Sequence, residues 1–226
     1  MNSKANKPVR PSTEVWAKLK HRVIAPGLCT HCGTCVGLST PELTMASSSS
    51  GPVPKALGPG AGAAHPYAYE ACPGKGLNYP DLYQHVFGSL PESWLIGPQK
   101  QLFVGHSPDE ALRQNAASGG IITQVLVHLL HEGFVDGAVV VVQGRPEPWS
   151  AEPVLATSEE EILSASQSVY VPVPVNTILA KVEAFPGRLA YVGLPDQVSS
   201  IRQLQALGHG PSKKIEIILG PYVGTY

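Results

Sequence analysis

Residues 118–142 read Ser118-Gly-Gly-Ile-Ile-Thr-Gln-Val-Leu-Val-His-Leu-Leu-His-Glu-Gly-Phe-Val-Asp-Gly-Ala-Val-Val-Val-Val142. Apolar residues recur at helical spacing from Ile122 to Leu130, and Gly133 is placed to end that helix. The run from Gly137 to Val142 has the composition of a buried strand. The stretch therefore predicts a helix that leads into a strand of a covered sheet.

The same alternation continues on both sides of this stretch. Upstream, Ser107-Pro-Asp-Glu110 is typical of a capped helix start. Downstream, the pattern predicts helices over about 157–163, 175–185 and 195–207 and strands at 189–192 and 214–219. Strands that alternate with helices predict an α/β fold (mixed α+β), a sheet with helices packed on it.

Composition excludes two classes of function. The formal net charge is −1 with acids and bases interspersed, whereas a nucleic-acid surface shows a basic stripe. Apolar runs stay shorter than the roughly 18 to 20 residues that a membrane span needs. The N-terminus, MNSKANKPVRPSTEVW, has no apolar segment that would mark a secretory signal, so we expect a cytoplasmic, reducing location.

The cysteines point to a metal centre. Cys29-Thr-His-Cys32-Gly-Thr-Cys35 places three thiols at three-residue intervals in one loop, and Cys72, followed by a proline, is the fourth and last cysteine of the chain. Three close thiolates and one distant thiolate suit the corners of a cubane cluster. The sequence therefore predicts a [4Fe-4S] cluster held by Cys29, Cys32, Cys35 and Cys72, in a small iron-sulfur module ahead of the sheet.

Other interpretations of these cysteines fit less well. Zinc modules usually present two separated Cys-x-x-Cys pairs, and neighbours at this spacing rarely reach disulfide geometry. His31 stands between two better ligands, so we interpret it as a loop residue.

These patterns predict four segments. Residues 1–45 hold an N-terminal helix and the ferredoxin-like cysteine loop, and residues 46–66 are rich in Gly, Ser, Pro and Ala with almost no charge, typical of a flexible insertion with little reason to pack. Residues 67–97 carry the fourth cluster ligand and a connector. Residues 98–226 form the α/β domain; because the chain stops directly after a strand, we expect that it is truncated or that another chain supplies the final layer.

The turn Ser118-Gly119-Gly120 is a second candidate site. Free amides at a helix start can bind a phosphate or an electron-rich ring edge, although such a turn also serves as a simple cap and hinge. No Gly-x-Gly-x-x-Gly fingerprint follows a strand, so a standard Rossmann cofactor site has little support.

Six segments together resemble one known family in the same order along the chain. They are Cys29 to Cys35, Cys72-Pro73, Arg113 with Ser118-Gly-Gly120, Gly133-Phe-Val-Asp-Gly137, Ser168-Val-Tyr-Val-Pro-Val-Pro174 and Tyr191-Val-Gly-Leu-Pro-Asp-Gln197. The family is that of the coenzyme F420 hydrogenase/dehydrogenase beta subunits, which includes the 7-hydroxymethyl chlorophyll a reductases.

The resemblance implies an FAD-bearing domain fed by the iron-sulfur module. By carry-over, Ser118, Gly119, Gly120 and Thr123 would lie against the flavin, with Arg113 as a charged donor nearby. Tyr170 and Gln197 would line the same cleft, although Tyr170 is equally well interpreted as a core aromatic. No catalytic residue follows from the sequence.

Two departures from the family pattern concern cysteines. Many members have cysteine at the position of Asp196 and shortly after the last strand, where this chain has Gly220-Pro-Tyr-Val223. The C-terminal half therefore offers no thiol for a second cluster.

The leading functional hypothesis is an iron-sulfur flavoprotein oxidoreductase that passes electrons between the cluster, FAD and a two-electron partner. That partner would be a small molecule of the F420-like deazaflavin or tetrapyrrole type. The alternative is a non-catalytic electron-relay subunit of a larger hydrogenase/dehydrogenase complex. The protein partner would be a ferredoxin or another subunit of such a complex, with oligomerisation left open and no nucleic acid or membrane span expected.

Overall fold

The computed structural model describes residues 10–58 and 62–222. The predicted segments 1–45, 46–66 and 98–226 each include a few residues outside this description, namely 1–9, 59–61 and 223–226. Over the described residues the chain is a mixed α/β protein with a four-stranded sheet and a separate two-stranded hairpin.

The N-terminal part is made of short elements. They are α1 (Thr13–Leu19), the π-helical turn η1 (Lys20–Ile24), α2 (Thr34–Leu38), β1 (Leu43–Ser48), β2 (Gly51–Ala56), α3 (Tyr67–Glu70) and η2 (Pro73–Lys75). The next helix, α4 (Tyr79–Phe87), precedes a long connection without strands or helices.

The remaining elements build the main sheet and its covering helices. They are α5 (Glu110–Asn115), η3 (Ser118–Gly120), α6 (Ile121–His131), β3 (Gly137–Gln143), β4 (Ala151–Ala156), α7 (Glu159–Leu163), η4 (Val175–Ile178), α8 (Leu179–Ala184), β5 (Leu189–Val192), α9 (Pro195–Ala206), η5 (Pro211–Lys214) and β6 (Ile215–Leu219). The expectation of a sheet with helices packed on it is confirmed.

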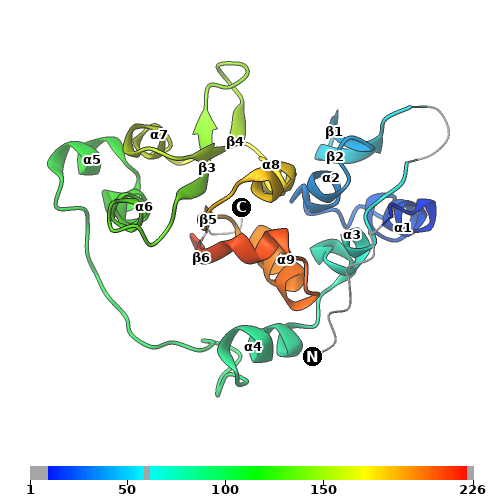
Figure 1. The fold of residues 1–226 in the computed structure, drawn as a ribbon, viewed down its shortest axis with the longest axis horizontal. Helices are drawn as coiled ribbons and strands as arrows, with labels where there is room; N and C mark the ends of the chain where they lie inside the picture. Colours follow the sequence, from blue (N-terminus) through cyan, green and yellow to red (C-terminus); the bar gives the residue numbers. More distant parts are fainter. Residues whose placement is uncertain (1–9, 59–61, 223–226) are drawn as a thin grey trace.

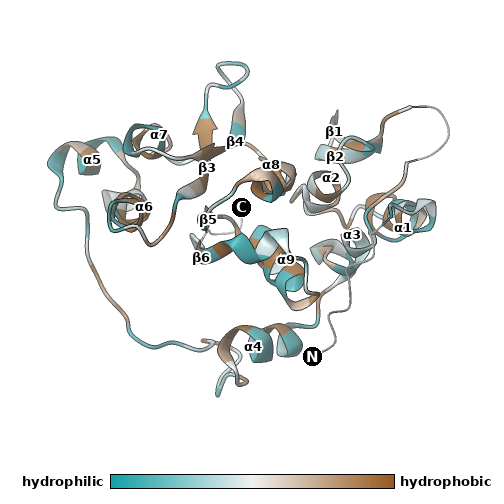
Figure 2. Ribbon diagram, viewed as in Figure 1, coloured by the Kyte–Doolittle hydropathy of each residue, from teal (hydrophilic) through white to brown (hydrophobic). Residues whose placement is uncertain are grey.

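The main sheet has the strand order β4-β3-β5-β6. The inner pairs β3–β5 and β5–β6 are parallel, whereas β3 and β4 are antiparallel. Because β3 and β5 are central, their residues must suit two covered faces. Figure 2 shows β3 in the hydrophobic colour, as a strand buried on both faces requires.

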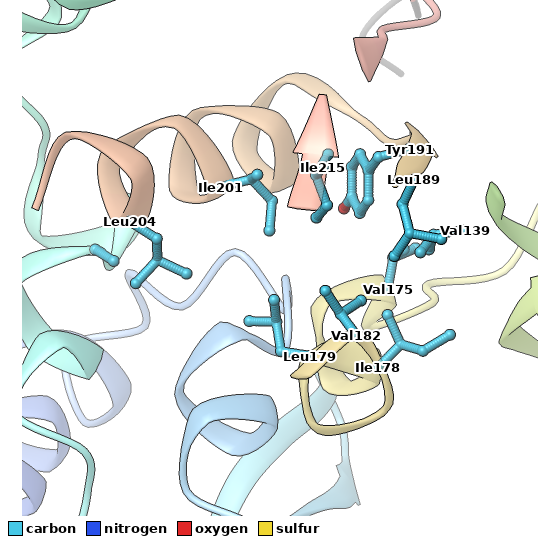
Figure 3. Packing of buried hydrophobic residues seen from close by; sticks show 11 residues of the cluster. Val139, Val175, Ile178, Leu179, Val182, Leu189, Tyr191, Ile201, Leu204 and Ile215 are labelled. Carbon is cyan, nitrogen blue, oxygen red and sulfur yellow. The ribbon is translucent and has the colours of Figure 1, made fainter. Parts of the chain in front are cut away.

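One face of the sheet packs against α8 and α9. Val139 of β3, Leu189 of β5 and Ile215 of β6 contact residues of both helices, and all are almost fully buried. Figure 3 shows Ile201 and Leu204 of α9 and Leu179 and Val182 of α8 pointing into this cluster. Burial of each such aliphatic side chain contributes roughly 1.5 to 3 kcal/mol.

The opposite face packs against α6 and α7. Leu126 of α6 and Ile162 of α7 meet Ala138 and Val140 of β3, which flank Val139 of the other face. Alternate residues of one strand thus enter two different cores, because successive side chains of a strand point to opposite faces.

The N-terminal elements enclose a third apolar cluster. Trp16 and Leu19 of α1 pack with Val36 of α2, Leu43 of β1 and Ala68 of α3. Figure 1 shows α1, α2, α3 and the hairpin grouped on one side of the molecule, with α5, α6 and α7 on the opposite side and α8 and α9 between them.

The described part of segment 46–66 corrects one expectation. Strands β1 and β2 pair in register from Leu43–Ala56 to Ser48–Gly51, and Ala64 is fully buried and exchanges two backbone hydrogen bonds with Ser12. The prediction that this segment has little reason to pack is therefore wrong. This segment has few large side chains, and backbone pairing and contact with the start of α1 hold it in place instead.

Two smaller differences concern local signals. Strand β4 was not expected; it contains Pro153, which an edge strand tolerates because its outer side needs no hydrogen-bond donor. Helix α5 is capped by Asp109, whose Oδ1 accepts from Leu112 N at 3.0 Å. Ser107, the expected cap, instead donates to Gln124 Oε1 at 2.7 Å and so holds α6.

The connection between α4 and α5 runs along the outside of the molecule (Figure 1). Its apolar side chains are exposed, among them Leu95, Leu102, Phe103 and Val104. In the described part of the chain, none of the helices combines the length and the apolar character needed to cross a membrane.

Candidate metal centre

The four cysteines line one cavity. Cys29 and Cys32 stand in the loop before α2, Cys35 is in α2, and Cys72 directly follows α3. The cavity measures about 360 Å³ including its opening to solvent, and all four thiols are free of disulfide bonds. The fold thus brings Cys72 across 37 residues of chain to the three-cysteine loop.

The thiols surround this space rather than meet at one point. Across the described ranges 10–58 and 62–222, no group of three or more His, Cys, Asp or Glu side chains is arranged to hold a metal ion. A cubane cluster differs from a single ion because each thiolate binds a different iron at a separate corner. Four thiols around one shared cavity are therefore compatible in donor type and number with a cubane.

Two glycines set the path of the cysteine loop against the sheet domain. Gly33 has φ 86°, and a Cβ there would lie 2.7 Å from Pro174 O. A Cβ at Gly37 in α2 would lie 2.0 Å from Asn176 O. Only glycine permits this approach, and it allows Asn176 N to donate to Cys32 O at 2.9 Å.

His31 points away from the thiols. Its Nδ1 lies 2.7 Å from Pro52 O in strand β2, and the residue does not line the cavity. The contact ties the cysteine loop to the hairpin. His31 is thus a loop residue, as interpreted from the sequence.

Burial is the main electrostatic influence on the thiols. Together with the neighbouring thiols, it raises the pKa of Cys35 well above its usual value and the pKa of Cys72 to about 12. The pKa values of Cys29 and Cys32 are raised as well, again first by burial. Four thiolates in this cavity therefore require compensating positive charge, which iron would supply.

Asp196, at the start of α9, also belongs to this site. Burial raises the pKa of its carboxyl group, and the nearby Thr30 side chain lowers it in part. Its charge acts on Cys29 and Cys32. The sequence singled out Asp196 only as a position where many family members have cysteine. Its place at the start of the helix that follows β5 was a further signal that the sequence offered.

A buried polar network joins the cysteine loop to the α/β domain. Thr34 Oγ1 lies 3.4 Å from Cys32 Sγ and 2.7 Å from Ser200 Oγ of α9. Asn176 donates from Nδ2 to Thr34 Oγ1 at 2.9 Å, and Tyr191 OH donates to Asn176 Oδ1 at 2.5 Å. The sequence carried no signal for this network, because its members are far apart along the chain.

The predicted flavin residues fall into two groups. Ser118, Gly119 and Gly120 form a turn of left-handed backbone (φ 49°, 76° and 75°) ahead of α6. Arg113 of α5 lies nearby, with Nη1 3.1 Å from His106 Nδ1 and 3.4 Å from Ser107 O, and Ser107 N donates to Gly119 O. Thr123 follows within the first turn of α6 and is buried.

The second group consists of Gln197, which lies on the cysteine side next to Asn176, and Tyr170. Gln197 in α9 is 5% exposed; its Oε1 accepts from Leu194 N at 2.9 Å and its Nε2 donates to Val173 O at 3.0 Å. Tyr170 is 84% exposed, so its interpretation as a core aromatic is wrong. The side-chain amide of Gln197 already holds the segment that follows Tyr170.

A polar cavity opens beside the first group. It measures about 600 Å³ including its open side, and its lining includes Asn115 after Arg113, Gln143 at the carboxyl end of β3, and residues 164–167 after α7. Ligands of open α/β sheets bind outside the carboxyl ends of the strands. The cavity therefore has the location of a cofactor site, but none of the predicted flavin residues lines it.

Comparison with known proteins identifies one family for part of the chain. Residues 102–180 match the family model described as coenzyme F420 hydrogenase/dehydrogenase, beta subunit N-term. The coenzyme F420 hydrogenase subunit beta of Methanothermobacter thermautotrophicus is 32% identical over 133 residues, which cover 57% of this chain and 47% of that protein. The resemblance to this beta-subunit family is confirmed.

Two further relatives extend the comparison. The coenzyme F420-dependent sulfite reductase of Methanocaldococcus jannaschii is 23% identical over 87% of this chain and 28% of its own length. A chain of the F420-reducing [NiFe] hydrogenase complex from Methanosarcina barkeri has a TM-score of 0.48 at 29% identity, covering 51% of this chain and 41% of its own. The chain spans about half or less of the length of these relatives.

Proposed function

We propose that this chain is the iron-sulfur and flavin-binding part of an oxidoreductase. Cys29, Cys32, Cys35 and Cys72 would hold one [4Fe-4S] cluster, and the α/β domain would bind FAD. When bound, the cluster supplies one-electron transfer and FAD exchanges electrons singly or as a hydride pair. The oxidoreductase class agrees with the printed names of the relatives.

The observation that carries the proposal is the shared cavity of four thiols. It combines three ligands from one loop with a fourth from beyond α3, the ligand set that a cubane needs. The apolar residues around it, such as Leu19 and Ala68, keep water from the buried thiols. The chain's own contribution is thus a preorganised set of donors in a low-dielectric pocket.

The flavin proposal rests on the turn ahead of α6. Left-handed backbone at Ser118, Gly119 and Gly120 turns the chain ahead of α6, and backbone amides in such a turn can bind an anionic or electron-rich group. Arg113 supplies a positive charge near the turn, and Thr123 is buried in the first turn of α6. Tyr170, exposed on its loop, would cover the cofactor, whereas Gln197 would position that loop.

The proposed reaction partners are of two kinds, a small molecule and a redox protein. A deazaflavin of the F420 type is the two-electron substrate suggested by the names of the matched proteins, with a tetrapyrrole as the second class. A ferredoxin or a hydrogenase/dehydrogenase subunit would exchange single electrons at the cluster.

A non-catalytic electron relay is the second candidate. The specific observation in its favour is that the side-chain amide of Gln197 is occupied by protein partners. A relay subunit would hold the cluster without FAD and dock on a larger complex.

Anaerobic purification followed by iron, acid-labile sulfide and flavin quantification tests these candidates. The proposal expects about four irons, four sulfides and one FAD per chain. A full cluster without flavin after incubation with FAD would select the relay. Protein without iron and sulfide would overturn both.

Replacement of the remote ligand tests the ligand set. Cys72→Ser is expected to abolish the full cubane, since the cavity then has three thiols. His31→Ala is the matched control in the same loop and is expected to keep the cluster, because His31 faces Pro52. A complete cubane in Cys72→Ser would show that another residue is the fourth ligand.

A further inference from the structure

A chain of hydrogen bonds leads from Cys32 into the α/β domain. Cys32 Sγ lies 3.4 Å from Thr34 Oγ1, Thr34 Oγ1 lies 2.7 Å from Ser200 Oγ, and Ser200 Oγ donates to Ala71 O at 2.8 Å. Thr34 is 1% exposed and Ser200 is fully buried. Water therefore does not compete for these hydroxyl groups.

The far end of the chain fixes the direction of its hydrogen bonds. Ala71 O can only accept, so the single hydroxyl hydrogen of Ser200 is committed to it. The oxygen of Ser200 then accepts, which leaves the hydroxyl hydrogen of Thr34 to be donated toward Ser200. In the thiol form, Cys32 completes the series by donating its own hydrogen to Thr34 Oγ1.

Asn176 fixes the orientation of Thr34. Its Nδ2 donates both to Thr34 Oγ1 at 2.9 Å and to Gln197 O at 3.2 Å, while its Oδ1 accepts from Tyr191 OH. Gln197 O can only accept and Tyr191 OH donates, so the side-chain amide of Asn176 can take only this orientation. Thr34 therefore receives one hydrogen bond from Asn176 and has a single hydrogen of its own to give.

Loss of the Cys32 proton changes which groups donate and which accept in this chain of hydrogen bonds. An iron-bound thiolate at Cys32 can only accept, so Cys32 Sγ and Ser200 Oγ compete for the one hydrogen of Thr34. A hydrogen bond to a ligand sulfur stabilises the more negative, reduced cluster and raises its reduction potential. The competition lies in a dry interior, where such a bond is electrostatically stronger than in water.

We propose that Thr34 is a positioning residue that sets the reduction potential of the cluster, with Ser200 as the competitor for its hydrogen. This inference rests on the proposed cluster and adds how the α/β domain regulates it. Helix α9 carries Ser200, so a shift of α9 relative to the cysteine loop changes the share of the hydrogen bond that reaches Cys32.

The test is a redox titration of anaerobically prepared protein, poised with dithionite and mediators and followed by electron paramagnetic resonance. Thr34→Val removes the donor and is expected to lower the midpoint potential. Ser200→Ala removes the competitor and is expected to raise it. Each shift corresponds to as much as about a tenfold change in the oxidised-to-reduced ratio, or about 59 mV for one electron. Thr34→Ser keeps the hydroxyl group and is expected to restore the wild-type potential.

The opposite signs separate this role from a structural one. Shifts of the same sign in Thr34→Val and Ser200→Ala, or unchanged potentials in both, would overturn the proposal while leaving the cluster in place. If Thr34→Val does not load the cluster, the sign of the Ser200→Ala shift decides. Wild-type protein that holds neither iron nor sulfide would overturn the proposed function as well.

Discussion

The cysteine cavity and the turn at Ser118-Gly119-Gly120 differ in how completely the fold surrounds them. The cavity is lined by residues of the N-terminal elements, and buried hydrogen bonds from Thr34 join it to the sheet domain. The turn has no such enclosure: Ser118 is exposed, and the polar cavity reached through Asn115 of the preceding helix is open to solvent. The proposed cluster would therefore lie in the interior, whereas the proposed flavin would be reached from the surface, where it can meet a substrate.

The largest effect is expected from a substitution that breaks the close contact between α2 and η4. Gly37→Val would place a Cβ 2.0 Å from Asn176 O, so α2 must move away from η4. We expect a loss of about 2 to 5 kcal/mol in the free energy of unfolding, with loss of the cluster. Urea denaturation measures the loss, and Gly210→Ala, where a Cβ meets open space, is the control.

A smaller effect is expected from the buried network. Tyr191→Phe leaves Asn176 Oδ1 without its hydroxyl donor in a buried site, which costs about 1 to 3 kcal/mol. Tyr170→Phe is the matched control on the exposed side and is expected to leave the unfolding free energy unchanged. Equal effects of the two variants in chemical denaturation would contradict the contrast between the two sites.

Removal of the positive charge next to the glycine turn tests the proposed flavin site. Arg113→Ala is expected to weaken FAD binding about fivefold, which corresponds to about 1 kcal/mol for one exposed charged contact. Fluorescence titration with FAD measures the affinity. Arg145→Ala, in the exposed β3–β4 hairpin, is the control. An unchanged affinity in Arg113→Ala would place the flavin elsewhere.

The smallest effect concerns pH at the contact between the N-terminal part and the sheet domain. Burial, together with the neighbouring His65 whose ring centroid lies 5.8 Å away, lowers the pKa of His209 to about 4. In the unfolded chain, the same imidazole takes up its proton near the ordinary histidine pKa of 6.5. Stability is therefore full above about pH 6.5 and declines as the pH falls toward 4.

Because His209 is partly exposed, we expect a loss of only about 1 kcal/mol or less. Unfolding at pH 7.5 and pH 5 measures this loss, and His209→Gln is expected to reduce the difference between the two pH values. The same difference in both proteins would assign the acid sensitivity to other groups.

Several elements of the fold were predictable because local patterns and packing agree. The apolar spacing of α6, the alternation-free run of β3 and the strand at Leu189–Val192 all occur where expected. The hairpin β1–β2 was missed because its small residues carry no periodic pattern; its order comes from pairing between two segments. Strand β4 was missed for a similar reason, since β3 provides its hydrogen bonds.

The sequence by itself determined the donor chemistry of this protein: four cysteines with three in one loop, and a glycine turn ahead of an amphipathic helix. Only the tertiary structure decided what surrounds them. It brought Cys72 to the loop and set Thr34 against Ser200, 166 positions away. Ligand type is a property of individual side chains, whereas burial and hydrogen-bond partners depend on which distant segments the packed core brings together.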